Sequence, residues 1–143
     1  MATFNKYQQF VEDLGNKVHD LVGTDDTLKV ALTNTAPNAA THAVRADITE
    51  LATGGGYTQN AAGNDVQNSG SESGGTLTVT GTDVVFTASA GTIGPFRYVV
   101  LYNDTPAAPA DPLIGWWDYG SSITLADGES FTVDFGASIF TIA

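Results

Sequence analysis

Carboxylates are the main groups in this sequence that could do chemistry, because it has 16 Asp and Glu, two His and no Cys. Asp104, Asp111 and Asp118 bracket two apolar segments, and they would meet Trp116 and Trp117 if they converged at one end of a sheet. A pair of carboxylates that flanks the scissile bond of a sugar forms the catalytic site of most glycan hydrolases. Asp104 and Asp111, however, stand close to prolines in turn-type sequences, where an Asp side chain bonds its own backbone. We therefore favour turn roles for these two residues and keep a small glycan hydrolase as a third hypothesis.

The remaining candidate groups predict no catalytic residue, no cofactor and no metal. His19 follows Val18 in an amphipathic segment, where we expect it to face solvent or the rim of the core, and His42 lies in a polar loop. Neither has ligand-type neighbours at metal-binding spacing. The run Gly54-Gly55-Gly56 lacks the Lys-Ser/Thr of a phosphate loop, and no Gly-x-Ser-x-Gly elbow is present. We expect a protein that is not an enzyme.

Composition and charge exclude several other classes of function. A net charge of −11 argues against nucleic acid and against anionic lipid as partners, since both are bound through Lys and Arg. No segment approaches the ~20 apolar residues of a membrane span, and the first residues lack the pattern of a signal peptide. The sequence therefore predicts a soluble protein made in a cytoplasm. Only 15% of residues are charged while 19 are Thr, which favours a polar, uncharged surface that contacts other proteins.

The first segment has the spacing of an amphipathic helix. Apolar residues recur every three or four positions, which places them on one helix face: Phe4, Tyr7, Val11, Leu14, Val18 and Leu21. We predict a helix over residues 3–22, with Thr3 as N-cap and Gly23 at the left-handed position after its end. This helix would pack on its own sheet or on a neighbouring subunit.

The rest of the chain predicts a β domain over residues 28–142, within a single domain 1–143. Short apolar and Thr-rich segments recur at roughly 8–12 residues, the pattern of an antiparallel β-sandwich or jelly-roll-like barrel with about nine or ten strands. We expect strands at 28–33, 76–80, 84–88, 96–102, 113–119, 122–125, 131–135 and 138–142, with 96–102 buried on both faces. Asp127-Gly128 predicts a tight turn. Residues 53–75 form a Gly/Ser-rich loop region with one or two short strands, anchored by Tyr57 and Val66 and more mobile than the rest.

Arg97 and the two tryptophans are ambiguous between local and functional roles. Arg97 stands between Phe96 and Tyr98, which favours a cation over an aromatic ring or a salt bridge within the sheet, although an inter-subunit ion pair is the alternative. Strand alternation places Trp116 and Trp117 on opposite faces, so that one belongs to the core and the other to solvent, a second layer or a partner.

Four segments resemble a family of small proteins encoded in the structural-gene regions of tailed bacteriophages and prophages. They are LKVALTNTAP (28–37), GPFRYVVLYND (94–104), PLIGWWDYG (112–120) and FVEDL (10–14). The resemblance extends over most of the chain and is lowest in the Gly/Ser-rich middle. Members of the family are described as virion or hypothetical proteins, so the resemblance implies a phage particle and supplies no catalytic residues.

The resemblance and the composition together predict a head decoration or cement protein on the capsid surface of a virion. Its partner would be the major capsid protein, it would form a homo-oligomer such as a trimer, and it would be assembled in the reducing cytoplasm of the host bacterium, where disulfides are not expected. The alternative is a tail or tail-fibre component, either tube-like or a carbohydrate-binding adhesin module. The candidate interface residues are Phe4, Tyr7, Val11, Leu14, Arg97, Trp116 and Trp117.

Overall fold

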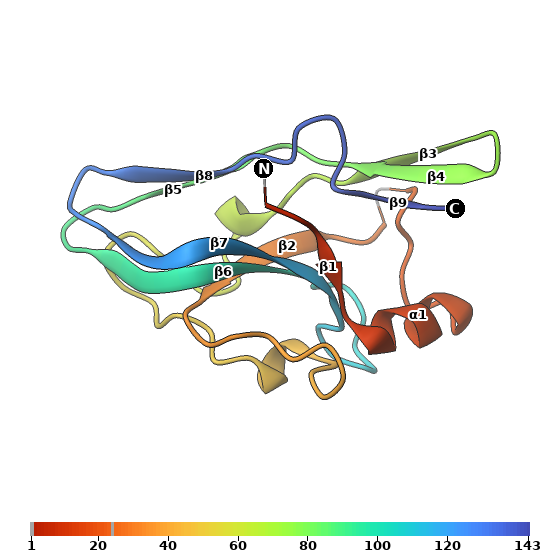
Figure 1. The fold of residues 1–143 in the computed structure, drawn as a ribbon, viewed down its shortest axis with the longest axis horizontal. Helices are drawn as coiled ribbons and strands as arrows, with labels where there is room; N and C mark the ends of the chain where they lie inside the picture. Colours follow the sequence, from red (N-terminus) through yellow and green to blue (C-terminus); the bar gives the residue numbers. More distant parts are fainter. Residues whose placement is uncertain (1, 24) are drawn as a thin grey trace.

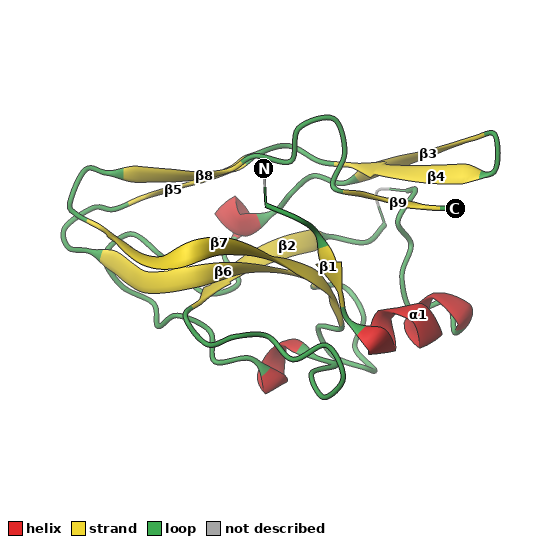
Figure 2. Ribbon diagram, viewed as in Figure 1, coloured by secondary structure: helices red, strands yellow, loops and turns green. Residues whose placement is uncertain are grey.

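Strands make up 43% and helix 10% of the chain in the computed structural model, which describes residues 2–23 and 25–143 (Figures 1 and 2). Within these residues there are one α-helix, α1 (Gln8–Gly15), two short 3-10 helices, η1 (Arg45–Asp47) and η2 (Ala62–Asn64), and nine strands. The strands are β1 (Asn5–Lys6), β2 (Leu28–Thr33), β3 (Ser69–Ser73), β4 (Thr76–Thr80), β5 (Val84–Thr87), β6 (Ile93–Asn103), β7 (Leu113–Leu125), β8 (Ser130–Val133) and β9 (Phe140–Ile142). All their pairings are antiparallel. The predicted antiparallel architecture is confirmed as a β-sandwich-like fold.

One layer is a four-stranded sheet in the order β1-β7-β6-β2. Its two long central strands, β6 and β7, have 11 and 13 residues. Every residue of β2 is buried, and the end of β6 from Val99 to Asn103 is buried as well. Continuous burial without alternation is typical of strands that are covered on both faces.

The second layer consists of two smaller sheets, β3-β4-β9 and β5-β8, which lie side by side above the four-stranded sheet in Figure 1. Burial alternates most clearly in β5, where Val84 and Phe86 are buried while Val85 and Thr87 are exposed. This period of two is typical of a sheet with one face on the core and one in solvent.

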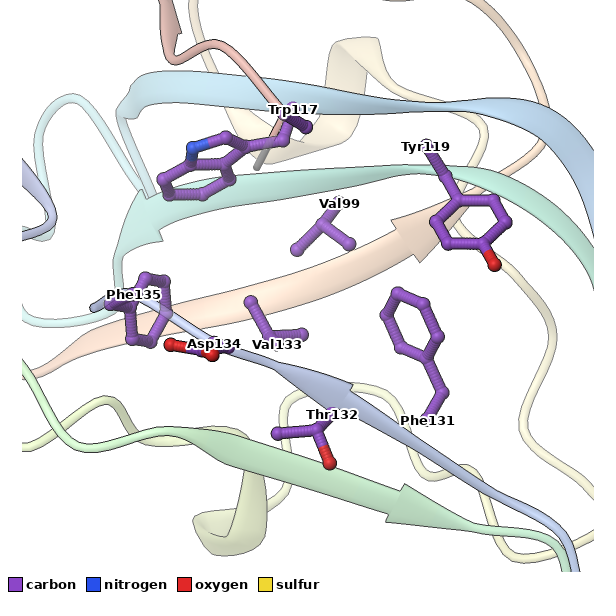
Figure 3. Close-up of a pocket in the computed structure, with 9 residues that line it drawn as sticks. Val99, Trp117, Tyr119, Phe131, Thr132, Val133, Asp134 and Phe135 are labelled. Carbon is purple, nitrogen blue, oxygen red and sulfur yellow. The ribbon is translucent and has the colours of Figure 1, made fainter.

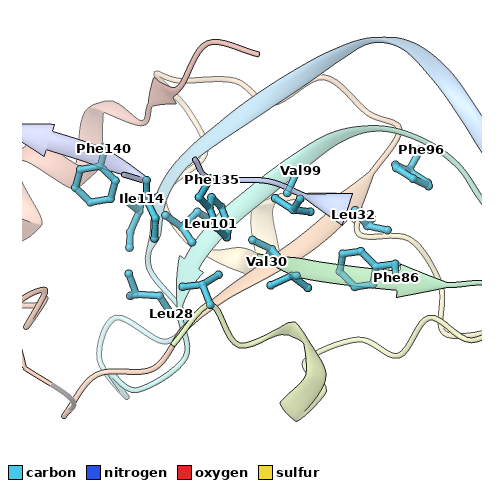
Figure 4. Close-up of a cluster of buried hydrophobic side chains, with 14 of the residues drawn as sticks. Leu28, Val30, Leu32, Phe86, Phe96, Val99, Leu101, Ile114, Phe135 and Phe140 are labelled. Carbon is cyan, nitrogen blue, oxygen red and sulfur yellow. The ribbon is translucent and has the colours of Figure 1, made fainter. Parts of the chain in front are cut away.

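The main core lies between the two layers and joins apolar side chains from nearly every strand (Figure 4). Leu28, Val30 and Leu32 of β2 face it together with Val99 and Leu101 of β6. The two predicted anchors of the Gly/Ser-rich region are confirmed: Tyr57 and Val66 are 1% and 0% exposed and belong to this core.

A second, smaller core covers the opposite face of the four-stranded sheet. Its buried residues are Tyr7, Ala31, Ile48, Val100, Tyr102 and Leu113, with Trp116 packed against them. Val99 and Val100 are neighbours in β6 but lie in different cores. The prediction that the strand 96–102 is buried on both faces is therefore confirmed for residues 99–102, whereas Arg97 and Tyr98 are only half-buried.

The predicted helix over residues 3–22 was wrong in extent. Residues 5 and 6 pair with Trp116 and Gly115 as strand β1, and Tyr7 rather than Thr3 is the N-cap. The helix ends at Gly15, and Lys17 adopts a left-handed φ of 58°. Hydrogen bonds from the amides of Lys17 and Val18 to the carbonyls of Leu14 and Asp13 close a Schellman motif there, so Gly23 is not the terminating residue.

Several other boundaries also differ from the prediction. The expected strands 113–119 and 122–125 form one strand, β7, which passes through Gly120 at a φ of 99°. The ambiguous segment 43–51 contains the 3-10 helix η1.

Residues 53–75 contain one strand, β3, as expected, and Asp127-Gly128 lies in the predicted turn, between β7 and β8. In the described ranges, no helix is both long and apolar enough to span a membrane.

Candidate functional site: an aromatic cleft beside strand β8

An apolar cleft of about 320 Å³ opens between the four-stranded sheet and β8 (Figure 3). Val99 of β6 and Trp117 of β7 form its floor; they are directly opposite each other in the sheet. Tyr119 lies two residues after Trp117 and extends the same face. Tyr119 is 54% exposed, an unusually open position for a large aromatic side chain that belongs to a sheet.

The wall of the cleft is β8 and the residues that follow it. All five residues from 131 to 135 contact the cleft, although successive side chains of a strand point to opposite faces. A continuous run of lining residues therefore means that the cleft follows the edge of the strand. The rings of Phe131 and Tyr119 are 5.6 Å apart, as are those of Phe135 and Trp117, so aromatic pairs hold the wall on the floor.

Both strands at the cleft have an edge without a strand partner in the described structure. β8 pairs only with β5. β7 pairs with β6 on one side, but on the other side β1 reaches only Gly115 and Trp116. An unpaired edge presents a row of free N–H and C=O groups that a further strand can bond. The cleft is thus apolar in its side chains and polar along its backbone rim.

Asp134 is the charged side chain at the cleft, whereas Arg97 and Asp118 pair on the other face of the sheet, because Asp118 lies between Trp117 and Tyr119 in β7. Arg97 donates two hydrogen bonds to Asp118, with N–O distances of 2.8 and 2.9 Å, and lies over the ring of Tyr98. The local role predicted for Arg97 is therefore confirmed. The hydrogen bond from Arg97 also holds the pKa of Asp118 below its usual range. Among the described residues that line the cleft, Asp134 is the one charged group, and its side chain is exposed.

A second hollow, of about 290 Å³, lies beside η1, and its lining includes the charged side chains of Arg45, Glu50 and Asp111. Arg45 forms ion pairs with Glu50 at 2.6 Å and with Asp111 at 3.5 Å. The hydroxyl of Tyr57 donates to Glu50 at 2.6 Å and accepts from the amide of Leu32 at 3.1 Å. Burial, reinforced by the charge of Glu50, raises the pKa of Tyr57. This cluster fixes the 34–60 segment on the sheet and offers a ligand no unpaired charge.

Lys29 and Asp104 form a further ion pair beside this cluster, at 2.7 Å. Lys29 also donates to the side-chain oxygen of Asn60, which accepts from the hydroxyl of Tyr102 as well. Asp104 and Asp111 thus pair with cations, rather than bonding their own turns as we predicted. Asp104, Asp111 and Asp118 each face a different base, so the structure does not bring them together with the tryptophans as a hydrolytic site.

His19 lies outside the helix, in a half-buried position against Phe10 and β6, which is the rim of the core rather than open solvent among the two positions we predicted. Its Nδ1 is 3.1 Å from the amide nitrogen of Asn103, which also donates to Asp26. Burial lowers the pKa of His19, while the charges of Asp13 and Asp26 oppose this shift. No group of three or more potential metal-ligating side chains occurs in the part of the chain that the structure describes.

The predicted interface residues do not form one surface. Tyr7 is fully buried, so its assignment to an interface was wrong. Phe4 stacks on Phe140 and packs against Trp117, and Leu14 packs on the main core, whereas Val11 is 52% exposed.

Trp116 and Trp117 lie on opposite faces of β7, as predicted. Trp116 packs on Tyr7 in the smaller core, and Trp117 lines the cleft. Tyr119, Phe131 and Phe135 are the cleft residues that the sequence reasoning missed. The sequence did contain a signal for them, since Tyr119 continues the alternation that begins at Trp117, and Phe131, Val133 and Phe135 alternate along the predicted strand 131–135.

No protein-family model, curated protein or solved structure matches the chain. Its class is therefore the one that fold and site define: an acidic, β-sandwich-like protein with an apolar cleft along a strand edge that has no strand partner among the described residues.

Proposed function

We propose that the protein is a non-enzymatic structural protein of a tailed-bacteriophage virion, which decorates the head by binding the major capsid protein and stabilises the shell. The observation that carries the proposal is the aromatic cleft, which offers a docking surface without a catalytic group. Aromatic side chains with polar tips are enriched at protein interfaces because they combine a large contact area with few rotatable bonds.

The electrostatics support a binding role over a hydrolytic one. The three carboxylates that could have formed a glycan hydrolase site, Asp104, Asp111 and Asp118, are each paired with a base. A general acid in such an enzyme needs a raised pKa, and Arg97 moves the pKa of Asp118 in the opposite direction. The net charge of −11 would keep unassembled copies apart until they meet the shell.

A carbohydrate-binding module of a tail fibre is the second candidate, and the cleft itself favours it. Trp117 and the exposed Tyr119 provide aromatic faces, and Asp134 provides a hydrogen-bond acceptor at the rim. This arrangement is also compatible with a sugar ring, so the two candidates differ in location and ligand rather than in the residues used.

Separation of purified particles into heads and tails tests the proposal. We expect the chain to remain with the heads after separation, in a copy number comparable with that of the major capsid protein, as measured by quantitative mass spectrometry. Recovery of the chain with the tails, in few copies per particle, would instead support the fibre module.

A further inference from the structure

The pairing of β8 with β5 determines which backbone groups of β8 point to its free edge. Ala88, next to β5, donates to the carbonyl of Glu129 and accepts from the amide of Gly128, both at 2.8 Å, so its backbone points at β8. Bonded and non-bonded pairs alternate in an antiparallel ladder, and Val85 is opposite Thr132. The backbone N–H and C=O of Thr132 therefore point away from β5, toward the side where the cleft lies.

The shape of the cleft favours an extended chain over a small ligand. Its volume of about 320 Å³ is at the low end of the roughly 300–1,000 Å³ usual for small-molecule pockets. It runs along the edge of β8 from residue 131 to 133 and along the two residues that follow the strand. An added strand would place alternate side chains on Val99, Trp117 and Tyr119 while its backbone bonds that of Thr132.

Charge decides between a second copy and a different protein as the source of this strand. A second copy would bring its own net charge of −11 to a cleft that already carries Asp134, which opposes the pairing of two copies through this cleft. Asp134, the charged residue of the cleft lining, has one carboxylate oxygen bonded to the amide of Gly136. This position is complementary to a Lys or Arg on the partner.

We propose that β8 accepts an extended segment of the partner protein as an added antiparallel or parallel strand. Alternate apolar side chains of that segment fill the aromatic cleft, and a basic residue lies beside Asp134. The inference deepens the docking role proposed above and rests on it for the identity of the partner as a capsid protein.

A peptide titration tests the strand addition on the isolated protein. The probe is a capped peptide in which Val alternates with Thr and the last residue is Arg, and binding is followed by NMR on the labelled protein. We expect shifts at residues 130–135, Trp117 and Tyr119, and none from the same peptide N-methylated on alternate amides. Shifts elsewhere, no binding, or equal binding of the methylated peptide would overturn the inference. So would shifts at the cleft caused by an oligosaccharide and not by the peptide.

Two matched proline variants test the edge itself. Thr132→Pro removes the N–H that faces the cleft, whereas Val85→Pro, directly opposite, removes one on the far edge of the same two strands. We expect Thr132→Pro to weaken peptide binding by about tenfold or more and Val85→Pro to leave it unchanged. Equal binding by both variants would refute the strand addition, and if Thr132→Pro fails to fold, the methylated peptide gives the same test without a variant.

Binding to purified capsid shells separates this inference from the proposed function. If wild-type protein binds shells and folded Thr132→Pro binds them equally well, the strand addition is wrong while decoration stands. If the peptide binds the cleft but wild-type protein does not bind the shells, strand addition at the cleft stands and the capsid protein is not the partner.

Discussion

Removal of Arg45 should destabilise the protein far more than removal of Arg97, although both arginines form close ion pairs with a carboxylate. The side chain of Glu50 is 7% exposed and that of Arg45 18%, whereas Arg97 and Asp118 are 39% and 37% exposed. Arg45→Met leaves the carboxylate of Glu50 buried with Tyr57 as its remaining partner. Loss of one partner of a buried pair costs about 3–5 kcal/mol, and the residual exposure of Arg45 reduces this to about 2–3 kcal/mol.

Thermal and urea unfolding of the two variants measure this difference. At roughly 2–4 °C per kcal/mol, Arg45→Met should lower Tm by about 4–12 °C. Arg97→Met should change Tm little, because exposed ion pairs are screened by solvent. The double variant Arg45→Met/Glu50→Gln should recover part of the loss, since it leaves no unpaired charge. Equal Tm shifts for the two arginine variants, or no recovery in the double variant, would refute the reasoning.

Three further predictions concern stability. Burial lowers the pKa of His19, although the charges of Asp13 and Asp26 oppose the shift, so His19 binds a proton more readily in the unfolded chain than in the folded one. The free energy of unfolding should therefore decrease as the pH falls below about 6.5, and it should decrease less steeply in His19→Gln. Gly115→Ala would place a Cβ against the ring of Phe4 and should lower the free energy of unfolding in urea by about 1–3 kcal/mol. Gly63→Ala is the control, because a Cβ there meets no other atom, whereas Gly120→Ala would add strain from its positive φ. Tyr57→Phe leaves the buried amide of Leu32 without its acceptor and should cost about 1–3 kcal/mol by the same assay.

The strands were predictable from the sequence because their signal is local. Apolar and polar residues alternate in Val84–Thr87, and this strand is buried on one face. The apolar run 96–102 is continuous, and most of it is buried on both faces. The helix was predicted too long because Phe4 and Tyr7 before it, and Val18 and Leu21 after it, continue its periodicity. Before the helix, residues 5 and 6 pair with β7, the amide of Tyr7 bonds the carbonyl of Ile114, and Gly115 leaves room for the ring of Phe4.

The polar clusters and the cleft were not predictable from local patterns. Lys29 and Asp104 are 75 positions apart in the chain, and Arg45 and Asp111 are 66 apart. Such pairs depend on which strands become neighbours, and this is a tertiary property. The cleft likewise requires that β7 and β8 lie in different layers after a short turn, which leaves an edge of each without a strand partner among the described residues.

A cryo-EM map of the decorated head, at a resolution that separates strands, tests the central claim most directly. We predict that the map will show a strand of the capsid protein paired with β8, with its side chains against Trp117 and Tyr119. A map in which this protein contacts the shell through another face, with the cleft open to solvent, would contradict it.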